Sequence, residues 1–156
     1  MGRVLPLQEL AGLRPGFRSD GRSVVFTNGV FDILHRGHVE YLAKAKHLGD
    51  LLVVGLNSDD SVKRIKGEKR PIVSEGDRAF VLAHLDCVDF VCVFSEDTPR
   101  LIIDALVPDV LVKGADCEIR DIVGRETVEK AGGRVVTIEY VPDRSTTGII
   151  ERILER

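Results

Sequence analysis

The sequence predicts an α/β fold in which helices cover both faces of a mainly five-stranded parallel sheet. Five short runs rich in Val, Ile and Leu alternate with segments whose apolar residues recur at helical spacing. Such runs are typical of strands that are buried on both faces. Their alternation with helices implies parallel strands joined by right-handed crossovers. The predicted architecture is therefore a three-layer, Rossmann-like domain.

The strands matter for function because their carboxyl ends gather on one edge of a parallel sheet. The predicted strands are residues 23–27, 51–57, 89–94, 109–114 and 134–140. Ligands of such sheets bind beyond the carboxyl ends, near the point where the strand order reverses. Side chains that directly follow these strands are therefore the first candidates for a functional site.

Helices are predicted between and after the strands. Their expected ranges are 38–49, 75–86, 98–106, 122–131 and a last helix that runs to about residue 155. We expect Thr98 to cap the third, the pair Gly132–Gly133 to end the fourth, and Ser145 or Thr146 to cap the last. Residues 1–20 are expected to form an N-terminal arm or short helix, and residues 21–156 a single domain.

Composition limits the classes of function. The chain has 156 residues, 44% hydrophobic and 30% charged, which suits one globular domain with a core. A net charge of -3 gives no overall attraction to nucleic acid or to an anionic membrane. The start, "MGRVLPLQEL", lacks the apolar core of a signal peptide, and the three cysteines lack metal-ligand spacing. We therefore expect a cytoplasmic protein that binds neither membranes nor nucleic acid.

Two histidines follow the first predicted strand. The stretch "TNGVFDILHRGH", residues 27–38, places His35 and His38 three residues apart around a glycine, where a helix is expected to begin. Side chains at that spacing share one side of a helix, and a helix N-terminus attracts anions. Gly29 allows close backbone approach and Asp32 can hold the loop by hydrogen bonds. The pattern indicates phosphate ligands; a zinc site is the alternative, but no third ligand is evident nearby.

This stretch resembles the H-x-G-H nucleotidyltransferase superfamily, whose cytidylyltransferase-like members use the motif on nucleotide phosphates. The resemblance runs from about Val24 to Ile153. More narrowly, the chain resembles the adenylyltransferase domain of the bifunctional heptose kinase/adenylyltransferase of ADP-heptose synthesis. The segments that carry this likeness are "FTNGVFDILHRGHVEYLAKAKHLGD", "VGLNSDDSVKRIKGEKRP", "EDTPRLIIDALVPDVLVKGAD" and "DRSTTGII". No kinase half accompanies them, so we expect a stand-alone enzyme or an excised domain.

The resemblance implies a nucleotide site drawn from three parts of the chain. From the first strand and its loop it takes Thr27, Asn28, Gly29, Phe31, Asp32, His35, Gly37 and His38. From "VKGAD" it takes Lys113, Gly114 and Asp116, close to the base or ribose, and from "RSTT" it takes Ser145, Thr146 and Thr147, close to the triphosphate. The alternative for "VKGAD" is an ordinary turn between a strand and a loop. The alternative for "RSTT" is a helix cap, which would explain one of its three hydroxyls.

A basic stretch follows the second predicted strand. "SVKRIKGEKRP" contains Lys63, Arg64, Lys66, Lys69 and Arg70 within eight residues. A solvated basic loop is the alternative, but an anionic ligand is expected beside a strand end. The resemblance implies Lys63 as a catalytic residue with His35 and His38, and Lys66 as a substrate ligand. Arg78 resembles an arginine that some relatives use on the substrate phosphate, although a surface ion pair would equally explain it.

The resemblance implies transfer of AMP from ATP to a sugar 1-phosphate, with D-glycero-D-manno-heptose 1-phosphate as the favoured acceptor and Mg²⁺ as cofactor. The products are an ADP-sugar and pyrophosphate. An ionised acceptor phosphate needs no general base, which agrees with the lack of a nucleophile triad in the sequence. The expected ligands are ATP and a small phosphorylated sugar. The sequence is also compatible with a homodimer and with a separately encoded sugar kinase in the same pathway.

Three alternatives remain open. One is a glycerol-3-phosphate-type cytidylyltransferase, against which "CVDFV" at 87–91 counts because it lacks the arginine and tyrosine of "RYVDEV". Another is a nucleotide-binding module without turnover. The third is a fragment of an aminoacyl-tRNA synthetase, disfavoured by the small size, the acidic balance and the absence of a "KMSKS" stretch.

Overall fold

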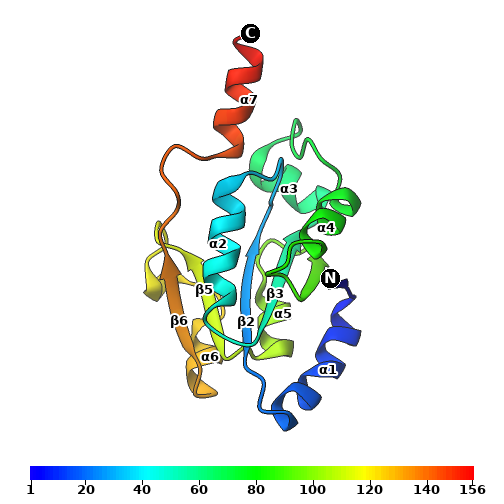
Figure 1. Ribbon diagram of the computed structural model, residues 1–156, viewed down its shortest axis with the longest axis vertical. Coiled ribbons are helices and arrows are strands. Elements are labelled where there is room, and N and C mark those ends of the chain that lie inside the picture. Colours follow the sequence, from blue (N-terminus) through cyan, green and yellow to red (C-terminus); the bar gives the residue numbers. More distant parts are fainter.

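The computed structural model describes residues 1–156 and contains one six-stranded, fully parallel sheet between two layers of helices (Figure 1). The strands lie in the order β1-β4-β3-β2-β5-β6. Their bounds are β1 Arg3–Val4, β2 Val24–Gly29, β3 Leu51–Asn57, β4 Phe90–Phe94, β5 Val110–Gly114 and β6 Arg134–Ile138. The five predicted strands are confirmed. The additional strand, β1, is too short to show a periodic pattern and pairs with β4 through Arg3 and Phe90.

Seven α-helices and one 3-10 turn connect the strands. They are α1 Leu7–Ser19, α2 Arg36–Lys46, α3 Asp59–Lys66, α4 Glu75–Ala83, α5 Arg100–Leu106, α6 Arg125–Lys130, α7 Thr146–Leu154 and η1 Ile119–Asp121. Thr98 does not cap α5, because the N-cap position is Pro99 and no side chain bonds there. Ser145 does cap α7, through a hydrogen bond from the Gly148 N–H.

The first part of the basic stretch is helical rather than a loop. Its hydroxyl cap is Ser58, which accepts a hydrogen bond from the backbone N–H of Ser61. Acidic residues then occupy the first turn of α3 and basic residues its last turn. This order complements the helix dipole at both ends and stabilises a helix of only eight residues.

Each face of the sheet has its own hydrophobic core. Val24 and Phe26 of β2 belong to the core beneath α1, α5 and α6, whereas Val25 belongs to the core beneath α2 and α4. This alternation follows from the pleat, which points successive side chains to opposite faces. Both cores end where the polar residues at the carboxyl ends of the strands begin, which leaves that edge for a site.

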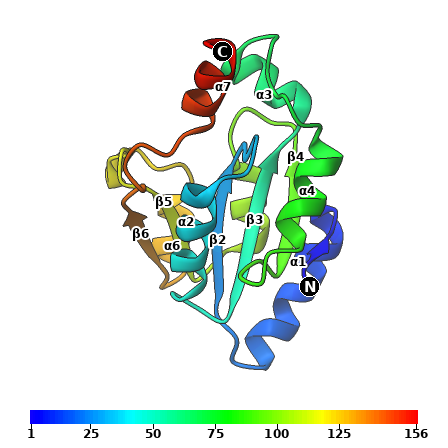
Figure 2. The same ribbon diagram turned by 45° about the horizontal axis from the view of Figure 1, so that its top comes forward.

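The last helix stands apart from both layers. No residue of α7 is buried, and the helix projects beyond the carboxyl edge of the sheet, at the same end of the molecule as α3 (Figures 1 and 2). A hydrogen bond from the Thr146 hydroxyl to the backbone carbonyl of Asp32 attaches its first turn to the loop after β2. The described helices include none with the length and apolarity needed to cross a membrane.

Candidate active site

The strand order places a cavity at the predicted edge. From β2 the sheet continues through β3 and β4 in one direction and through β5 and β6 in the other, so the order reverses between β2 and β5. A cavity of about 800 Å³ lies at these carboxyl ends. Its walls come from the β2–α2 loop, the end of α3, the ends of β5 and β6 and the start of α7. Segments more than 100 residues apart in the chain therefore share one cavity.

His35 and His38 cap the helix that they begin. The Nδ1 atom of His35 accepts a hydrogen bond from the Gly37 N–H at 3.0 Å, and Nδ1 of His38 accepts one from the His35 N–H at 3.3 Å. The two rings stack with their centroids 3.9 Å apart. A side chain at Gly37 would lie 2.9 Å from the His35 ring, so glycine is required between them.

The surroundings of both imidazoles favour their neutral form. Burial lowers the pKa of His38 to about 4, with nearby His35 adding to the shift and Asp32 opposing it. Burial, and then the positive charge of Arg144, also lower the pKa of His35. An Nδ1 that accepts a hydrogen bond carries no proton, so each ring carries its proton on Nε2. The pair therefore offers the cavity two neutral N–H donors.

This arrangement changes the expected role of the α2 N-terminus. The sequence predicts free backbone N–H groups there. In the structure the His35 ring accepts the Gly37 N–H and the His35 carbonyl accepts the His38 N–H. A ligand would meet the Nε2–H groups of the two rings instead. The helix still favours an anion at this end through its dipole.

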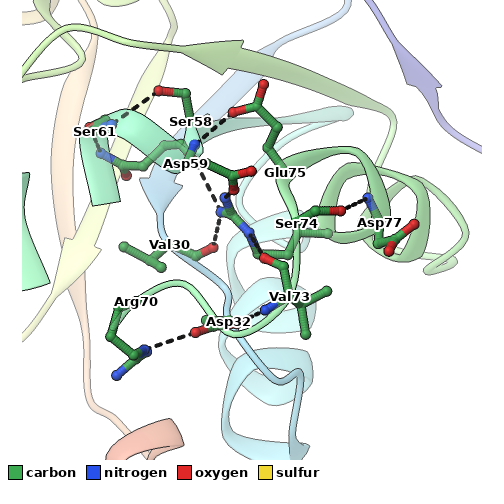
Figure 3. A network of polar contacts seen from close by, with 12 residues as sticks. Val30, Asp32, Ser58, Asp59, Ser61, Arg70, Val73, Ser74, Glu75 and Asp77 are labelled. Atoms are coloured by element: carbon green, nitrogen blue, oxygen red, sulfur yellow. Dashed lines mark hydrogen bonds and ion pairs between the residues drawn. The ribbon is translucent and has the colours of Figure 1, made fainter. Parts of the chain in front are cut away.

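Asp32 joins the loop after β2 to the segment between α3 and α4 (Figure 3). Its carboxylate is buried and accepts hydrogen bonds from Arg70 Nε at 2.9 Å, from the Ile72 N–H at 2.8 Å and from the Val73 N–H at 2.9 Å. Burial alone would raise the pKa of Asp32, but these bonds outweigh it and leave the pKa below its usual value. Asp32 is therefore an ionised clamp that holds Arg70 at the cavity wall.

Arg78 lies behind the cavity rather than in it. Its guanidinium is buried, with a residue exposure of 2%. It donates to three backbone carbonyls, those of Val30, Asn57 and Val73, at 2.7 to 2.9 Å, and pairs with Asp59 at 2.7 Å. These bonds tie together the loops that follow β2 and β3 and the start of α4 (Figure 3). The structure therefore does not place Arg78 as the substrate ligand that the resemblance implies, because every polar atom of its side chain already has a protein partner.

Lys113 and Asn28 meet where the strand order reverses. Lys113 in β5 donates a hydrogen bond from Nζ to Oδ1 of Asn28 in β2, and both residues line the cavity. Burial lowers the pKa of Lys113 to about 8, against a raising effect of Cys117. The preceding residue on β2, Thr27, is fully buried and hydrogen-bonds to the Tyr41 hydroxyl at 2.8 Å. Thr27 therefore lies behind the cavity wall and does not line the cavity.

Two tyrosines line the part of the cavity next to the end of β5. The rings of Tyr41 and Tyr140 stack with centroids 5.6 Å apart, and burial raises the pKa of both hydroxyls. The Tyr140 ring lies directly over Gly114, where any side chain would collide with it. With Asp116 beside them, these residues give the cavity an aromatic surface suited to stacking with a planar ring.

The first turn of α7 lines the same cavity and lies next to the loop that carries the histidines, since the Thr146 hydroxyl donates to the Asp32 carbonyl. Its first N–H groups have no acceptor within the helix, and Ser145 bonds only that of Gly148. Arg144, Ser145, Thr146 and Thr147 all line the cavity. A helix N-terminus with an adjacent arginine favours an anion, and the neighbouring β2–α2 loop adds the two imidazole donors to the same cavity.

Most of the predicted site residues line this one cavity. They are Asn28, Gly29, Phe31, Asp32, His35, Gly37, His38, Lys66, Lys113, Gly114, Asp116, Ser145, Thr146 and Thr147. Thr27, Lys63 and Arg78 do not line it. Lys63 is exposed on α3, one turn before Lys66, which does reach the wall.

Sequence reasoning assigned no role to several lining residues. They are Tyr41, Arg70, Tyr140 and Arg144. Arg70 and Arg144 stand inside the quoted motifs, so their charge was an available signal. Tyr41 lies on α2 inside a quoted segment but beyond its H-x-G-H residues, and Tyr140 lies just after β6, where no motif marks it.

The cavity does not contain a resident metal site. No cluster of three or more His, Cys, Asp or Glu side chains in the protein could hold a metal ion. The oxygens of Asp32 already accept three hydrogen bonds, which leaves Asp116 as the other lining carboxylate. Mg²⁺ is commonly bound by one or two carboxylates together with substrate phosphates, so this donor set fits an ion that enters with a nucleotide.

Comparison with known proteins agrees with this geometry. The cytidylyltransferase-like family matches residues 26–152. The chain is 56% identical over 153 residues to Bifunctional protein HldE of Geobacter sulfurreducens, covering 98% of this chain and 31% of that protein. It is 61% identical over 136 residues to Bifunctional protein HldE of Citrifermentans bemidjiense, covering 87% of this chain and 28% of that protein. The chain thus spans about three tenths of these curated relatives.

Two solved structures show the same fold as this chain. The lipopolysaccharide core biosynthesis protein of Thermoplasma volcanium superposes with a TM-score of 0.63 at 33% identity, over 78% of this chain and 98% of that one. A pantoate-beta-alanine ligase of Francisella tularensis shares the fold, with a TM-score of 0.62 at 14% identity, over 100% of this chain and 80% of that one. With the H-x-G-H loop at the strand-order reversal and a family match over most of its length, the chain belongs to the cytidylyltransferase-like family.

Proposed function

We propose that this chain transfers an adenylyl group from ATP to a sugar 1-phosphate and releases pyrophosphate. The favoured acceptor is D-glycero-D-manno-heptose 1-phosphate, which gives an ADP-heptose. One observation carries the proposal: two neutral imidazole donors and the first turn of α7 line the same cavity from segments more than 100 residues apart. An elongated polyanion such as a triphosphate suits two such walls.

The proposed reaction is a direct displacement at the α-phosphorus. An acceptor phosphate is largely ionised near neutral pH, so it needs no base to activate it. The protein has to align two anions and stabilise the charge that grows on the leaving pyrophosphate. His35 and His38 supply N–H donors for this purpose, and Arg144 with the α7 N-terminus supplies positive potential. Because the donors are neutral, they need no proton exchange during the reaction.

Mg²⁺ is proposed as part of the ATP substrate. It would neutralise charge on the phosphates and would be held chiefly by them. Asp116 is the lining carboxylate whose oxygens the structure leaves free of hydrogen bonds from the protein. This role does not require a metal site preformed in the protein.

The choice of ATP over CTP rests on the resemblance in "DVLVKGAD" and on the absence of the arginine and tyrosine of "RYVDEV". The relatives named Bifunctional protein HldE support an adenylyltransferase of heptose metabolism. We propose that it acts in the cytoplasm, with a sugar kinase activity supplying the phosphorylated acceptor. We also propose that residues 21–156 form one nucleotidyltransferase domain. Residues 1–20, which contain β1 and α1, would be its N-terminal arm.

A pyrophosphate-release screen tests the proposal. ATP and CTP are each combined with Mg²⁺ and a panel of sugar 1-phosphates and glycerol 3-phosphate. We expect turnover with ATP and a heptose 1-phosphate and poor turnover with CTP. Equal or better turnover with CTP would support a cytidylyltransferase, and ATP binding without pyrophosphate release would support a non-catalytic module.

A further inference from the structure

Helix α7 carries a stripe of apolar side chains that nothing in the protein covers. Ile149, Ile150, Ile153 and Leu154 recur at spacings that place them on one side of the helix. None of the four is buried, and Ile153 and Leu154 are 64% and 79% exposed. A helix that leaves such a stripe in water forgoes the free energy of burying it, so the stripe indicates a docking face.

The end of α3 has an uncovered apolar residue in the wall of the cavity at the strand-order reversal. Ser61 and Val62 are buried, and they precede Ile65 by about one helical turn. Ile65 therefore lies on the same side of α3 as these buried residues, yet it is 50% exposed and lines the cavity. The inward side of α3 thus ends in an isoleucine that lacks an apolar partner.

The attachment of α7 allows the helix to move as a unit. The bond from the Thr146 hydroxyl to the Asp32 carbonyl is the one hydrogen bond between α7 and the rest of the domain. No backbone hydrogen bond holds residues 139–144, and Asp143 there has a positive φ of 58°. The stripe begins about one turn, roughly 5.4 Å, beyond the anchored Thr146. A pivot at the anchor therefore keeps the stripe at the cavity that Ile65 lines.

The charges beside the two apolar surfaces are complementary. Glu151 and Glu155 lie one turn apart at the border of the α7 stripe, and Lys63 and Lys66 lie in the last turn of α3. None of these four side chains takes part in an ion pair of the protein. An acidic border beside one apolar surface and a basic border beside the other favour contact between the two helices.

We propose that α7 closes over the cavity when a nucleotide binds, by laying its apolar stripe on Ile65 at the end of α3. The closure rests on the proposed function, because a triphosphate supplies the attraction for it. Lys66 and Arg144 line the cavity from α3 and from the start of α7, and neither has a carboxylate partner. The two cations repel each other when the cavity is empty, whereas a bound triphosphate attracts both and so favours the closed form.

Closure protects the nucleotide from water. If the oxygen of a water molecule bonds to the α-phosphorus, the bond from that phosphorus to the bridging oxygen of pyrophosphate breaks. The electron pair leaves with pyrophosphate, the other product is AMP, and a proton passes to the solvent. A closed α7 excludes this water while the bound acceptor phosphate reacts. The contact between α7 and Ile65 therefore sets the ratio of transfer to hydrolysis.

A fluorescent reporter on α7 tests the proposal, because the chain contains no tryptophan of its own. The reporters are Leu154→Trp and, as a second position, Ile153→Trp. Emission wavelength and quenching by acrylamide are measured with and without Mg²⁺ and α,β-methylene-ATP, which cannot release pyrophosphate. Ile65→Ser is added to each reporter, and Val81→Ser on α4 is the matched control because it is also an exposed aliphatic residue and lies outside the cavity.

Calorimetry gives the affinity of each variant for the analogue, so that all are compared at saturation, and thermal unfolding checks the fold. We expect the saturating analogue to shift the emission of both reporters to shorter wavelength and to lower the quenching. Ile65→Ser should lose this shift and, with ATP and no acceptor, should raise pyrophosphate release by about 10-fold, as the loss of one buried aliphatic contact predicts. Val81→Ser should match its parent in both measurements.

The outcomes separate the possible failures. Unchanged emission in both reporters at saturation, with normal turnover, would overturn the closure and leave the proposed function standing. A shift that Ile65→Ser retains would overturn the contact with α3. A shift that appears only as light scattering shows a dimer would assign the stripe to a second copy of the chain and overturn closure within one chain. A normal shift without pyrophosphate release from ATP would overturn the proposed function alone, and failure to bind the analogue would overturn both.

Discussion

Acid should destabilise the protein through His38, and a variant that cannot titrate there should resist it. A free imidazole has a pKa of 6.5, whereas that of His38 in the fold is about 4. Between these two values the unfolded chain binds a proton that the folded protein does not, so stability is present above about pH 6.5 and is lost as the pH falls toward 4. The full difference is about 3 kcal/mol, of which about 2 kcal/mol falls between pH 7 and pH 5.

His38→Gln is the informative variant. Glutamine can still accept the His35 N–H, as it does in capping boxes, but it cannot bind a proton. The measurement is the free energy of unfolding in urea at about pH 7, 6 and 5 for both proteins, with the slope against urea compared at each pH. We expect the wild type to lose about 2 kcal/mol more than the variant. Equal losses in the two proteins would refute a neutral, half-buried His38, and with it the view that the site uses uncharged donors.

The remaining predictions concern Lys113 at the end of β5, the buried Arg78, and the histidines and α7 of the cavity at the strand-order reversal. The kcat/KM should fall as pH rises through about 8, where Lys113 loses its proton, and Lys113→Arg should abolish this fall; a flat wild-type profile would contradict it. Arg78→Met should cost about 3 to 5 kcal/mol in urea unfolding because it leaves Asp59 and three carbonyls without their partner, and a cost below about 1 kcal/mol would deny it the positioning role. Thr146→Ala and His35→Ala should each lower kcat/KM, and their double-mutant cycle should be non-additive by more than about 0.5 kcal/mol; strict additivity would mean that they do not share a ligand.

The sheet could be predicted because its strands are buried on both faces. Residues 51–57 are all buried, which is what a continuous run of apolar residues indicates. The two elements that sequence reasoning missed lack such a signal. Strand β1 has two exposed residues and is defined only by its pairing with β4. The first half of the basic stretch forms α3 because Ser58 caps the helix and the charges at its two ends match the helix dipole. The glycine and proline that indicate a loop come only after the end of this helix.

The site could be predicted as far as its motifs extend. The histidine pair, the end of β5 and the start of α7 line one cavity because all three follow parallel strands. The roles of the cations could not be read from their order in the chain. Lys63 and Lys66 are one helical turn apart, and only the latter lies at the cavity wall. Whether a basic residue faces a ligand or a protein carboxylate depends on contacts between distant loops, as the pairing of Arg78 with Asp59 demonstrates.

Two ion pairs hold the loops around the cavity in position, so the other charged side chains of the cavity remain free to contact a substrate. Asp32 with Arg70, and Asp59 with Arg78, join the loops after β2 and β3 to the segment that leads into α4. Each pair satisfies its charge inside the protein. Lys113, by contrast, donates its hydrogen bond to the neutral side-chain amide of Asn28. Buried charges that are paired hold the loops in place, whereas the unpaired one gives a reason for an anion to bind. The division between scaffold and substrate site in this domain therefore follows from which buried charges have partners.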